Sequence, residues 1–396
     1  MVVYKFTRGQ GAGNAGWRIP DGGWRIPDAG PFTFRVRHPP FAIRSPNSSQ
    51  GNHRLMPAER PVILSLTKMH DAGMRLLHES SELRMASGTD AATLQREVVG
   101  ADGLIIRTGG VVDAALMDAG KALKVVGRHG VGYDAIDIDA ATERGIQVVY
   151  TPGANTQSVA EHVFAMMIGL SKNFQRMSAA VADYRHHDRT RWTGRDIHGR
   201  TLGIIGFGRI GRKVGTIAHD AFDMKVLYTD IVAAPADVET KAGAKRMSFE
   251  EVLRASEYVT LHVPLDASTR HMINREALAL MRSDAILINA CRGPVVVEMA
   301  VADALDAGKL LAFGSDVFEE EPPPRGHPLI GRDDVMLTPH SAAQTDEGLS
   351  NMARGVARDV LAVLRGERPQ NPVNDPLIVE LRRKVLGLPP LYKPRS

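Results

Sequence analysis

Short apolar runs alternate with amphipathic stretches along most of the chain. The runs are too short for helices and are typical of buried strands; they occupy residues 61–66, 103–107, 122–127, 146–150, 202–205, 225–229, 258–263, 285–289, 312–316 and 335–337. Between them, helical patterns are expected at 70–83 and 113–119. Strands that alternate with helices predict parallel sheets with helices on both faces.

Two longer stretches have apolar positions at helical spacing and predict long helices. The first follows residue 155, with Ser158 and Glu161 in the S-x-x-E spacing of a capping box, and the second covers 347–365. Met166 and Met167 in the first are expected to pack in the core or at a subunit interface. The sequence His-His-Asp at 186–188 lacks the spacing of a helical zinc pair, so we expect a solvated helix end.

The apolar run at 202–205 leads into a glycine motif of the form GxGxxG. Its glycines are Gly206, Gly208 and Gly211, with Arg209 and Ile210 between the second and the third. In a dinucleotide-binding turn, the first glycine permits a tight bend, the second lets a pyrophosphate approach the backbone, and the third lets the helix pack on the strand. The phosphates then face free N–H groups at the start of the helix.

The next predicted strand ends in an acid, Asp230, nineteen positions after Gly211. A carboxylate there accepts hydrogen bonds from ribose hydroxyls, whereas an arginine would suit a 2′-phosphate. The pattern therefore predicts a Rossmann domain that binds NAD rather than NADP. A phosphate loop of the nucleoside triphosphatases is excluded, because Arg212 and Lys213 follow where Lys and then Ser or Thr are required.

Residues 1–55 differ in composition from the rest. Fourteen of them are Gly or Pro, eight are Lys or Arg and two are Asp, and GWRIPD occurs twice. We expect a disordered extension. A transit-peptide-like leader and a basic arm for nucleic acid are alternatives, but the simplest interpretation is a translated upstream extension with Met56 as the native start.

The remaining chain is nearly neutral, with 41 basic and 43 acidic residues, which gives no indication of a nucleic-acid footprint. No apolar run approaches the length of a membrane span. The one cysteine, Cys291, excludes an internal disulfide framework and a cysteine-rich metal site, so no metal is expected. Such cysteine usage is compatible with a cytoplasmic location.

Three segments at predicted strand ends carry polar groups. They begin at Asn289, Asp316 and Thr338 and contain Arg292, Glu321 and His340. Ligands of open α/β sheets bind beyond the carboxyl ends of the strands, so these three segments are expected to face one crevice.

Together with the glycine motif and Asp230, these segments resemble the NAD-dependent D-2-hydroxyacid dehydrogenase family. The chain is most similar to its D-3-phosphoglycerate dehydrogenase-like branch, and the likeness covers about residues 61–374 through three further stretches, 104–107 (LIIR), 127–132 (GRHGVG) and 155–161 (NTQSVAE). The resemblance implies a role for several residues of this chain, as well as its fold and a partner.

In the family pattern, Arg292 matches the arginine that holds the substrate carboxylate and keto oxygen, and His340 matches the general acid and base. Glu321 matches the partner of that histidine. The backbone of Val131 and Gly132 matches the loop that binds the substrate carboxylate. The resemblance also implies that Asp316 contacts the nicotinamide carboxamide. A carboxylate beside imidazolium keeps a proton available for the carbonyl oxygen when the keto acid is reduced.

Arg107 and Arg128 match arginines with which the phosphoglycerate branch binds its substrate. We therefore favour 3-phospho-D-glycerate, with glyoxylate, hydroxypyruvate or another short 2-keto acid as the alternative. Formate is disfavoured, because formate dehydrogenases have glutamine in place of Glu321. The family pattern departs at Val297, where an aspartate is common, and this puts the local loop geometry in doubt. A rival of another class is an NADH-sensing protein like the corepressors that share the fold.

The resemblance implies a homodimer whose subunit has two doubly wound parallel-sheet domains. A Rossmann NAD domain at about 156–341 is inserted into a flavodoxin-like substrate domain at about 56–155 and 342–375. No structure is predicted for the tail, 376–396.

Overall fold

The computed structural model describes residues 60–393. The predicted extension at 1–55 lies outside these residues. The described part contains two parallel β-sheets, one formed by the strands before residue 150 and one by the strands after residue 200.

The first sheet has five parallel strands in the order β2-β1-β3-β4-β5. Their bounds are β1 Val62–Ser65, β2 Glu82–Met85, β3 Gly103–Ile106, β4 Val125–Arg128 and β5 Gln147–Val149. This order is that of flavodoxin-like folds.

Successive residues of these strands pack on opposite faces of the sheet. Leu64, Leu104 and Val126 contact one layer of helices, and their neighbours Ile63, Ile105 and Val125 contact the other. The first layer consists of α2 (Ala91–Glu97), α3 (Ala114–Ala119) and α4 (Ile138–Glu143), and the second of α1 (Asp71–Ser80), α12 (Asp346–Leu364) and α13 (Pro376–Val385). Burial on both faces explains why the strands are continuous apolar runs in the sequence.

The second sheet has seven parallel strands in the order β12-β11-β10-β9-β6-β7-β8. The order reverses between β6 and β9, as in the Rossmann fold. The strands are β6 Thr201–Ile205, β7 Lys225–Thr229, β8 Ala244–Arg246, β9 Tyr258–Leu261, β10 Ile286–Asn289, β11 Ala312–Ser315 and β12 Val335–Leu337. The predicted fold class, two doubly wound parallel sheets, is confirmed.

Helices also cover both faces of the second sheet. One face packs on α9 (Phe249–Ala255), α10 (Arg275–Leu280) and α11 (Glu298–Asp306), and the other on α5 (Thr156–Ser171) and α7 (Arg209–Phe222). Met166 and Met167 are fully buried against the second of these faces, so they belong to the core. The remaining helices are α6 (Phe174–Ala182), α8 (Ala236–Lys241) and the 3₁₀ turns η1 (His186–Thr190) and η2 (Gly293–Val295).

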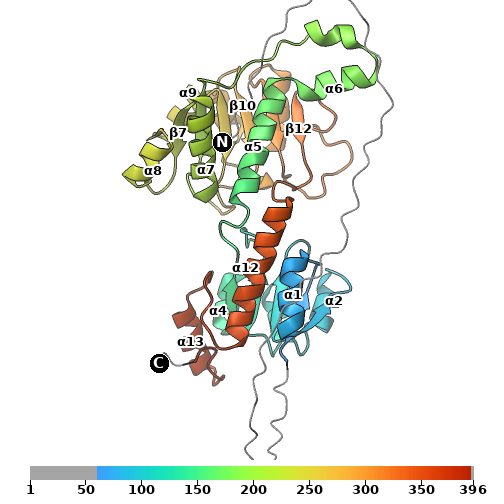
Figure 1. The fold of residues 1–396 in the computed structure, drawn as a ribbon, viewed down its shortest axis with the longest axis vertical. Helices are drawn as coiled ribbons and strands as arrows, with labels where there is room; N and C mark the ends of the chain where they lie inside the picture. The colour runs from blue at the N-terminus through green and yellow to red at the C-terminus, as the bar shows by residue number, and fades with distance from the viewer. Residues whose placement is uncertain (1–59, 394–396) are drawn as a thin grey trace, which may run out of the picture. The chain divides into compact units, whose positions relative to one another are not determined.

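The chain passes from the first sheet to the second at the start of α5 and returns at the start of α12 (Figure 1). A hydrogen bond of 2.7 Å between the hydroxyls of Ser158 and Thr345 joins these two crossings. The predicted capping box at Ser158 is therefore wrong. The N-cap of α5 is Asn155, and Ser158 lies inside the helix and bonds to the neighbouring crossing instead.

Two further predictions from the pattern are corrected. The helix expected at 70–83 ends at Ser80, and residues 82–85 form β2, the edge strand, whose side chains are mostly exposed and therefore lack an apolar pattern. In the 186–188 segment, Asp188 is buried rather than solvated, and it pairs with Arg185 and with Arg191 at 3.5 Å. The edge strand is fixed by its pairing with β1, whereas the contacts of Asp188 are made with arginines three residues away on either side.

The tail, for which no structure is predicted, contains a docked helix, α13. Asp375 caps it, with its side chain accepting from the N–H of Leu377, and Pro376 occupies the first turn. Val379 and Arg383 face inward, and Arg383 donates to the carbonyl oxygen of Gly145 at 2.9 Å. An arginine that replaces an apolar side chain in the inward face makes the pattern hard to recognise in the sequence.

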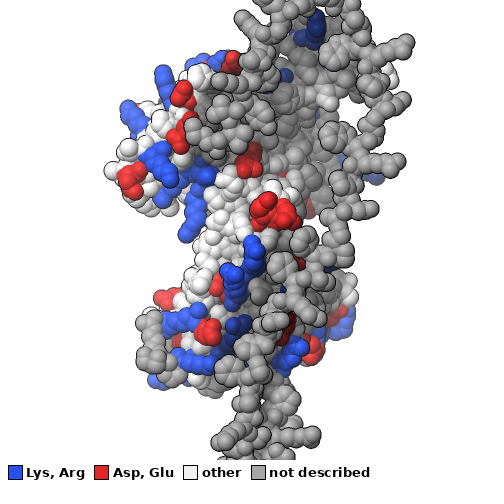
Figure 2. All heavy atoms as spheres, viewed as in Figure 1, with Lys and Arg blue, Asp and Glu red and all other residues white. Residues whose placement is uncertain are grey.

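The surface of the described residues carries both signs of charge. On the face drawn in Figure 2, basic and acidic side chains are interspersed. Among the helices that the structure describes, none is long and apolar enough to cross a bilayer.

We predict that Tyr392→Phe destabilises the fold. The buried Tyr392 hydroxyl donates to Gln147 Oε1 at 2.6 Å, and its removal leaves a buried acceptor without a partner. The expected loss is about 1–3 kcal/mol, measured as a lower midpoint of thermal unfolding. Tyr184→Phe is the matched control, because the Tyr184 side chain is 95% exposed. Equal midpoints for the two variants would contradict the docking of the tail.

Candidate active site

The glycine motif forms a tight turn between β6 and α7, and two of its glycines, Gly206 and Gly211, are required for steric reasons. Gly206 has φ +93°, and a Cβ at this position would lie 2.5 Å from the His262 carbonyl oxygen. A Cβ on Gly211 would lie 2.2 Å from the Gly206 carbonyl oxygen, so only glycine lets α7 pack this close. At Gly208, no atom lies within 4 Å of the place that a Cβ would occupy. The backbone at Gly208 is therefore open to a ligand.

The turn has the features that a dinucleotide requires. Gly208 is the N-cap of α7 and supplies no side-chain hydrogen bond, so the first N–H groups of the helix are free for phosphate oxygens. Arg209 and Ile210 are the first residues of α7, and together with Gly208 they line the adjoining cleft. When it is bound, NAD supplies or accepts a hydride.

Asp230 follows the last residue of β7, as predicted, and lies against the glycine turn. Its Oδ2 accepts from the N–H of Phe207 at 2.6 Å, and its Oδ1 accepts from the N–H of Val232 at 3.1 Å. The carboxylate is thus fixed at the edge of the turn, the place at which a Rossmann domain meets the ribose.

A cleft of about 540 Å³ adjoins the glycine turn and is lined by residues of both sheets. Val131 and Asp134 come from the loop after β4, and Arg292, Asp316 and His340 come from the strand ends of the second sheet. The three polar segments predicted to face one crevice therefore do so.

His340 and Glu321 form a hydrogen-bonded pair, with His340 Nδ1 and Glu321 Oε2 2.8 Å apart. Burial raises the pKa of Glu321, but the hydrogen bond and charge of His340 outweigh it, so the pKa lies below its ordinary value. Glu321 is therefore a carboxylate at neutral pH, and it accepts the hydrogen bond when Nδ1 of the imidazole carries a proton.

Asp316 holds the turn that carries His340. Its carboxylate accepts from the Thr338 hydroxyl at 2.6 Å and from the N–H groups of Ser341 at 2.7 Å and Ala342 at 2.8 Å. Its carbonyl oxygen accepts from the N–H of His340 at 2.7 Å. These contacts fix His340 in the left-handed conformation, with φ +52°. Asp316 thus orients the histidine, besides lining the cleft.

Arg292 reaches across the cleft to the loop that contains Val131 and Gly132. Its Nε donates to Asp134 Oδ1 at 3.0 Å and its Nη1 to the Cys291 carbonyl oxygen at 2.6 Å. A Cβ on Gly132 would lie 1.3 Å from Nη2, so the guanidinium occupies the space of a side chain there. The arginine and the predicted carboxylate-binding backbone are therefore in contact.

Arg107 and Arg128 are not among the residues that line this cleft, although both lie near it. The Arg128 side chain donates to the Arg107 carbonyl oxygen. Burial, and to a lesser extent the charge of Arg292, lower the pKa of Arg128 to about 10. Burial also lowers the pKa of Arg107. Arg107 and Arg292 thus both add positive charge to the surroundings of Arg128.

Several residues of the site are absent from the sequence prediction. Tyr133 and Tyr150 line the cleft and pack edge to face, with ring centroids 5.8 Å apart. His129 is buried beside the arginines, both of its ring nitrogens lack a partner among the described residues, and burial lowers its pKa to about 4. Asp134 could have been found as the acid two positions after Gly132. The other positions carry no signal in a single sequence.

Cys291 is buried at the base of the cleft, and its Sγ donates to Asn289 Oδ1 at 3.1 Å. Burial raises the pKa of the thiol to about 11, so it is not a thiolate at neutral pH. Val297 is the N-cap of α11 and makes no side-chain cap bond, yet the helix begins at the next residue. The departure from the family pattern at Val297 therefore leaves this helix start in place.

Comparisons with known proteins agree with this geometry. The family model for the D-isomer specific 2-hydroxyacid dehydrogenase NAD binding domain matches residues 164–342. The D-3-phosphoglycerate dehydrogenase of Methanocaldococcus jannaschii is 39% identical over 317 residues, which are 80% of this chain and 60% of that protein. This chain thus spans less than two thirds of that relative.

Other relatives match along almost their whole length. The glyoxylate reductase of Korarchaeum cryptofilum is 35% identical over 329 residues, 81% of this chain and 97% of that protein. The structure of D-lactate dehydrogenase from Aquifex aeolicus complexed with NAD and lactic acid has a TM-score of 0.72 at 31% identity, covering 79% of this chain and 98% of that one. The chain therefore belongs to the D-isomer specific 2-hydroxyacid dehydrogenase family, and its second sheet is the core of that family's NAD-binding domain.

Proposed function

We propose that the protein transfers a hydride between NAD and C2 of a D-2-hydroxy acid or the corresponding 2-keto acid. The observation that carries this proposal is the lining of one cleft by Arg292, by the glycine turn and by His340 with its partner Glu321. A ketone is reduced when hydride reaches its carbon and a proton reaches its oxygen, and this cleft offers a group for each requirement.

In this proposal, Arg292 and the backbone N–H groups of Val131 and Gly132 bind the substrate carboxylate. The arginine also polarises the keto oxygen, and its planar fork suits such two-point binding. His340 donates the proton in reduction and accepts it in oxidation. Glu321 fixes the orientation and the tautomer of the imidazole through the 2.8 Å hydrogen bond. Asp316, from its place in the cleft lining, is assigned to the nicotinamide carboxamide as well.

The charges around the cleft favour an anionic substrate with a second negative group. Asp134 pairs with Arg292 at 3.0 Å, and the charges of Arg107 and Arg292 both act on Arg128. The surplus of positive charge supports 3-phospho-D-glycerate, whose carboxylate and phosphate would share it. Glyoxylate and hydroxypyruvate are the alternative, in keeping with the glyoxylate reductase among the relatives.

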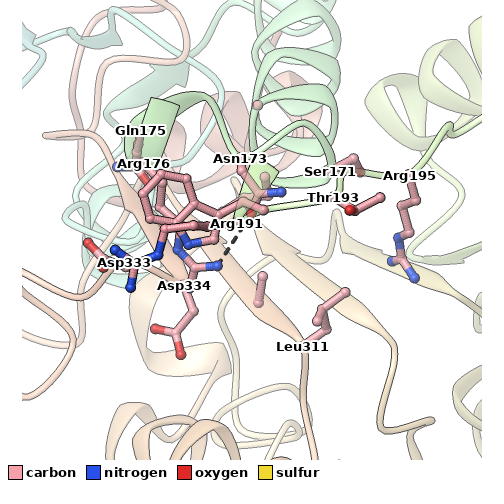
Figure 3. Close-up of a pocket in the computed structure, with 14 residues that line it drawn as sticks. Ser171, Asn173, Gln175, Arg176, Arg191, Thr193, Arg195, Leu311, Asp333 and Asp334 are labelled. Atoms are coloured by element: carbon pink, nitrogen blue, oxygen red, sulfur yellow. Dashed lines mark hydrogen bonds between the residues drawn. The ribbon is translucent and has the colours of Figure 1, made fainter. Parts of the chain in front are cut away.

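The proposal includes a homodimer formed through α6. This helix and its C-terminal end expose Phe174, Val181 and Tyr184 with exposed fractions of 56%, 64% and 95%. Exposed apolar and aromatic side chains, here two on the helix and one just after it, are typical of a protein interface when they are grouped. A separate cavity of about 290 Å³ lies at its start, where Arg176 and Arg191 face Asp333 and Asp334 (Figure 3). Because basic and acidic groups are both present, the cavity suits a polar protein segment better than a small anion.

The location proposed for the dimer is the cytoplasm.

The function is tested by steady-state turnover with NADH against a panel of 2-keto acids, together with oxidation of 3-phosphoglycerate by NAD. Turnover of at least one acid is expected, with the phosphorylated substrate preferred. Intact NADH binding without turnover of any acid would favour an NADH-sensing protein over an enzyme.

We predict that His340→Ala lowers turnover by about 10²–10⁴-fold, because the proton donor is lost. NADH affinity, measured by fluorescence titration, is expected to stay within about two-fold, since the imidazole acts at the reacting carbonyl. His187→Ala, at a histidine side chain that is 83% exposed, is the control. Full activity of His340→Ala would remove the proposed acid and base.

Asp230→Arg is expected to shift the preference from NAD toward NADP. The change removes a ribose acceptor and introduces a partner for a 2′-phosphate. The measurement is the ratio of kcat/KM for the two cofactors. Asp237→Arg, an equal charge change at an exposed position in α8, controls for the general increase in positive charge. An unchanged ratio in Asp230→Arg would show that this acid does not select the cofactor.

A further inference from the structure

Arg292 is held by groups that come from two different sheets. Its Nη1 donates at 2.6 Å to the carbonyl oxygen of Cys291, its own neighbour after β10. Its Nε donates at 3.0 Å to Asp134, which follows β4 in the other sheet. Bonds at Nε and at Nη1 fix both the position and the plane of the guanidinium, because the group is rigid and flat.

The remaining nitrogen, Nη2, lies on the loop predicted to bind the substrate carboxylate. It is 1.3 Å from the place that a Cβ of Gly132 would occupy, so it rests directly against this residue. Nη2 has no hydrogen-bond partner among residues 60–393. The guanidinium is therefore oriented with one nitrogen available at the carboxylate-binding loop.

The charge of Asp134 is as important as its position. Burial raises the pKa of Asp134, but the charge and the hydrogen bond of Arg292 lower it by more, and Arg128 lowers it as well. The pKa therefore lies below its ordinary value. Asp134 is therefore ionised beside two guanidinium groups that repel each other. Loss of this carboxylate would leave the repulsion between Arg128 and Arg292 without a counter-charge at Arg292 Nε.

We propose that Asp134 is a positioning residue that holds the Arg292 guanidinium against Gly132, ready for the substrate carboxylate. Asp134 acts through Arg292. This inference rests on the proposed function for its effect on turnover, but the placement of the guanidinium can be tested without it.

An ordinary surface ion pair would make a different prediction. Exposed pairs contribute about 0–1 kcal/mol to stability and nothing to catalysis, and the Asp134 side chain is 43% exposed. The chain offers such a pair for comparison. Asp118 and Arg144 are joined at 2.7 Å on the outer surface of the same sheet unit, and the Asp118 side chain is 65% exposed.

The test compares Asp134→Ala with Asp118→Ala. For Asp134→Ala, a misplaced guanidinium is expected to lower kcat/KM for the keto acid about 10–100-fold, through both a higher KM and a lower kcat. NADH affinity and the thermal midpoint are expected to match those of Asp118→Ala. Asp134→Asn, which keeps an oxygen acceptor for Nε, is expected to retain more activity than Asp134→Ala.

A double-mutant cycle separates positioning from a general structural effect. If Asp134 acts through Arg292, then Asp134→Ala costs less than about three-fold in an Arg292→Lys background, where the rigid fork is already absent. The inference is overturned if the same loss appears in both backgrounds, if NADH affinity falls in parallel with kcat/KM, or if Asp134→Ala retains full activity.

A crystal structure of Asp134→Ala gives a result that does not depend on activity. We expect the Arg292 guanidinium to leave Gly132. A guanidinium that stays in place overturns the inference, whether or not the chain reduces a keto acid. Absence of wild-type turnover with every acid of the panel, combined with the expected movement of Arg292, would instead defeat the proposed function alone.

Discussion

Burial of both faces of each parallel sheet is the constraint on which the rest of the structure depends. Leu104 and Ile105, or Leu287 and Ile288, are neighbours in sequence and pack into opposite helical layers. No face of either sheet is then free for polar chemistry. Polar groups are placed at the carboxyl ends of the strands, where the backbone leaves the sheet and the cleft begins.

The cleft brings together charges that neither sheet would hold alone. Arg107 and Arg128 lie at strand ends of the first sheet and Arg292 at a strand end of the second, and both Arg128 and Arg292 lower the pKa of Asp134. Grouped cations are costly without a counter-charge. The cluster is therefore prepared for an anion, and a substrate carboxylate would complete it. The hydrogen-bonded pair of His340 and Glu321 adjoins the same cleft.

The catalytic candidates depend on neighbours that do no chemistry themselves. Asp316 receives hydrogen bonds from a hydroxyl and two backbone N–H groups, and so fixes the turn that carries His340. His162 of α5 extends this network through a 2.9 Å hydrogen bond to Thr338. Because α5 begins where the chain enters the second sheet, the geometry of the histidine turn is linked to the crossing between the sheets.

The sequence by itself determined most of the strands, the two long helices, the glycine turn and the acid after β7, because each depends on local periodicity or on a steric requirement of a few neighbouring residues. Tertiary structure decided the rest. The edge strand β2, the inward-facing Arg383 of α13 and the contact of Ser158 with Thr345 have no local pattern, since each is fixed by a partner distant in sequence. The pairing of Asp134 with Arg292 is of the same kind: 158 residues separate them, and only the meeting of two sheets at one cleft brings them to 3.0 Å.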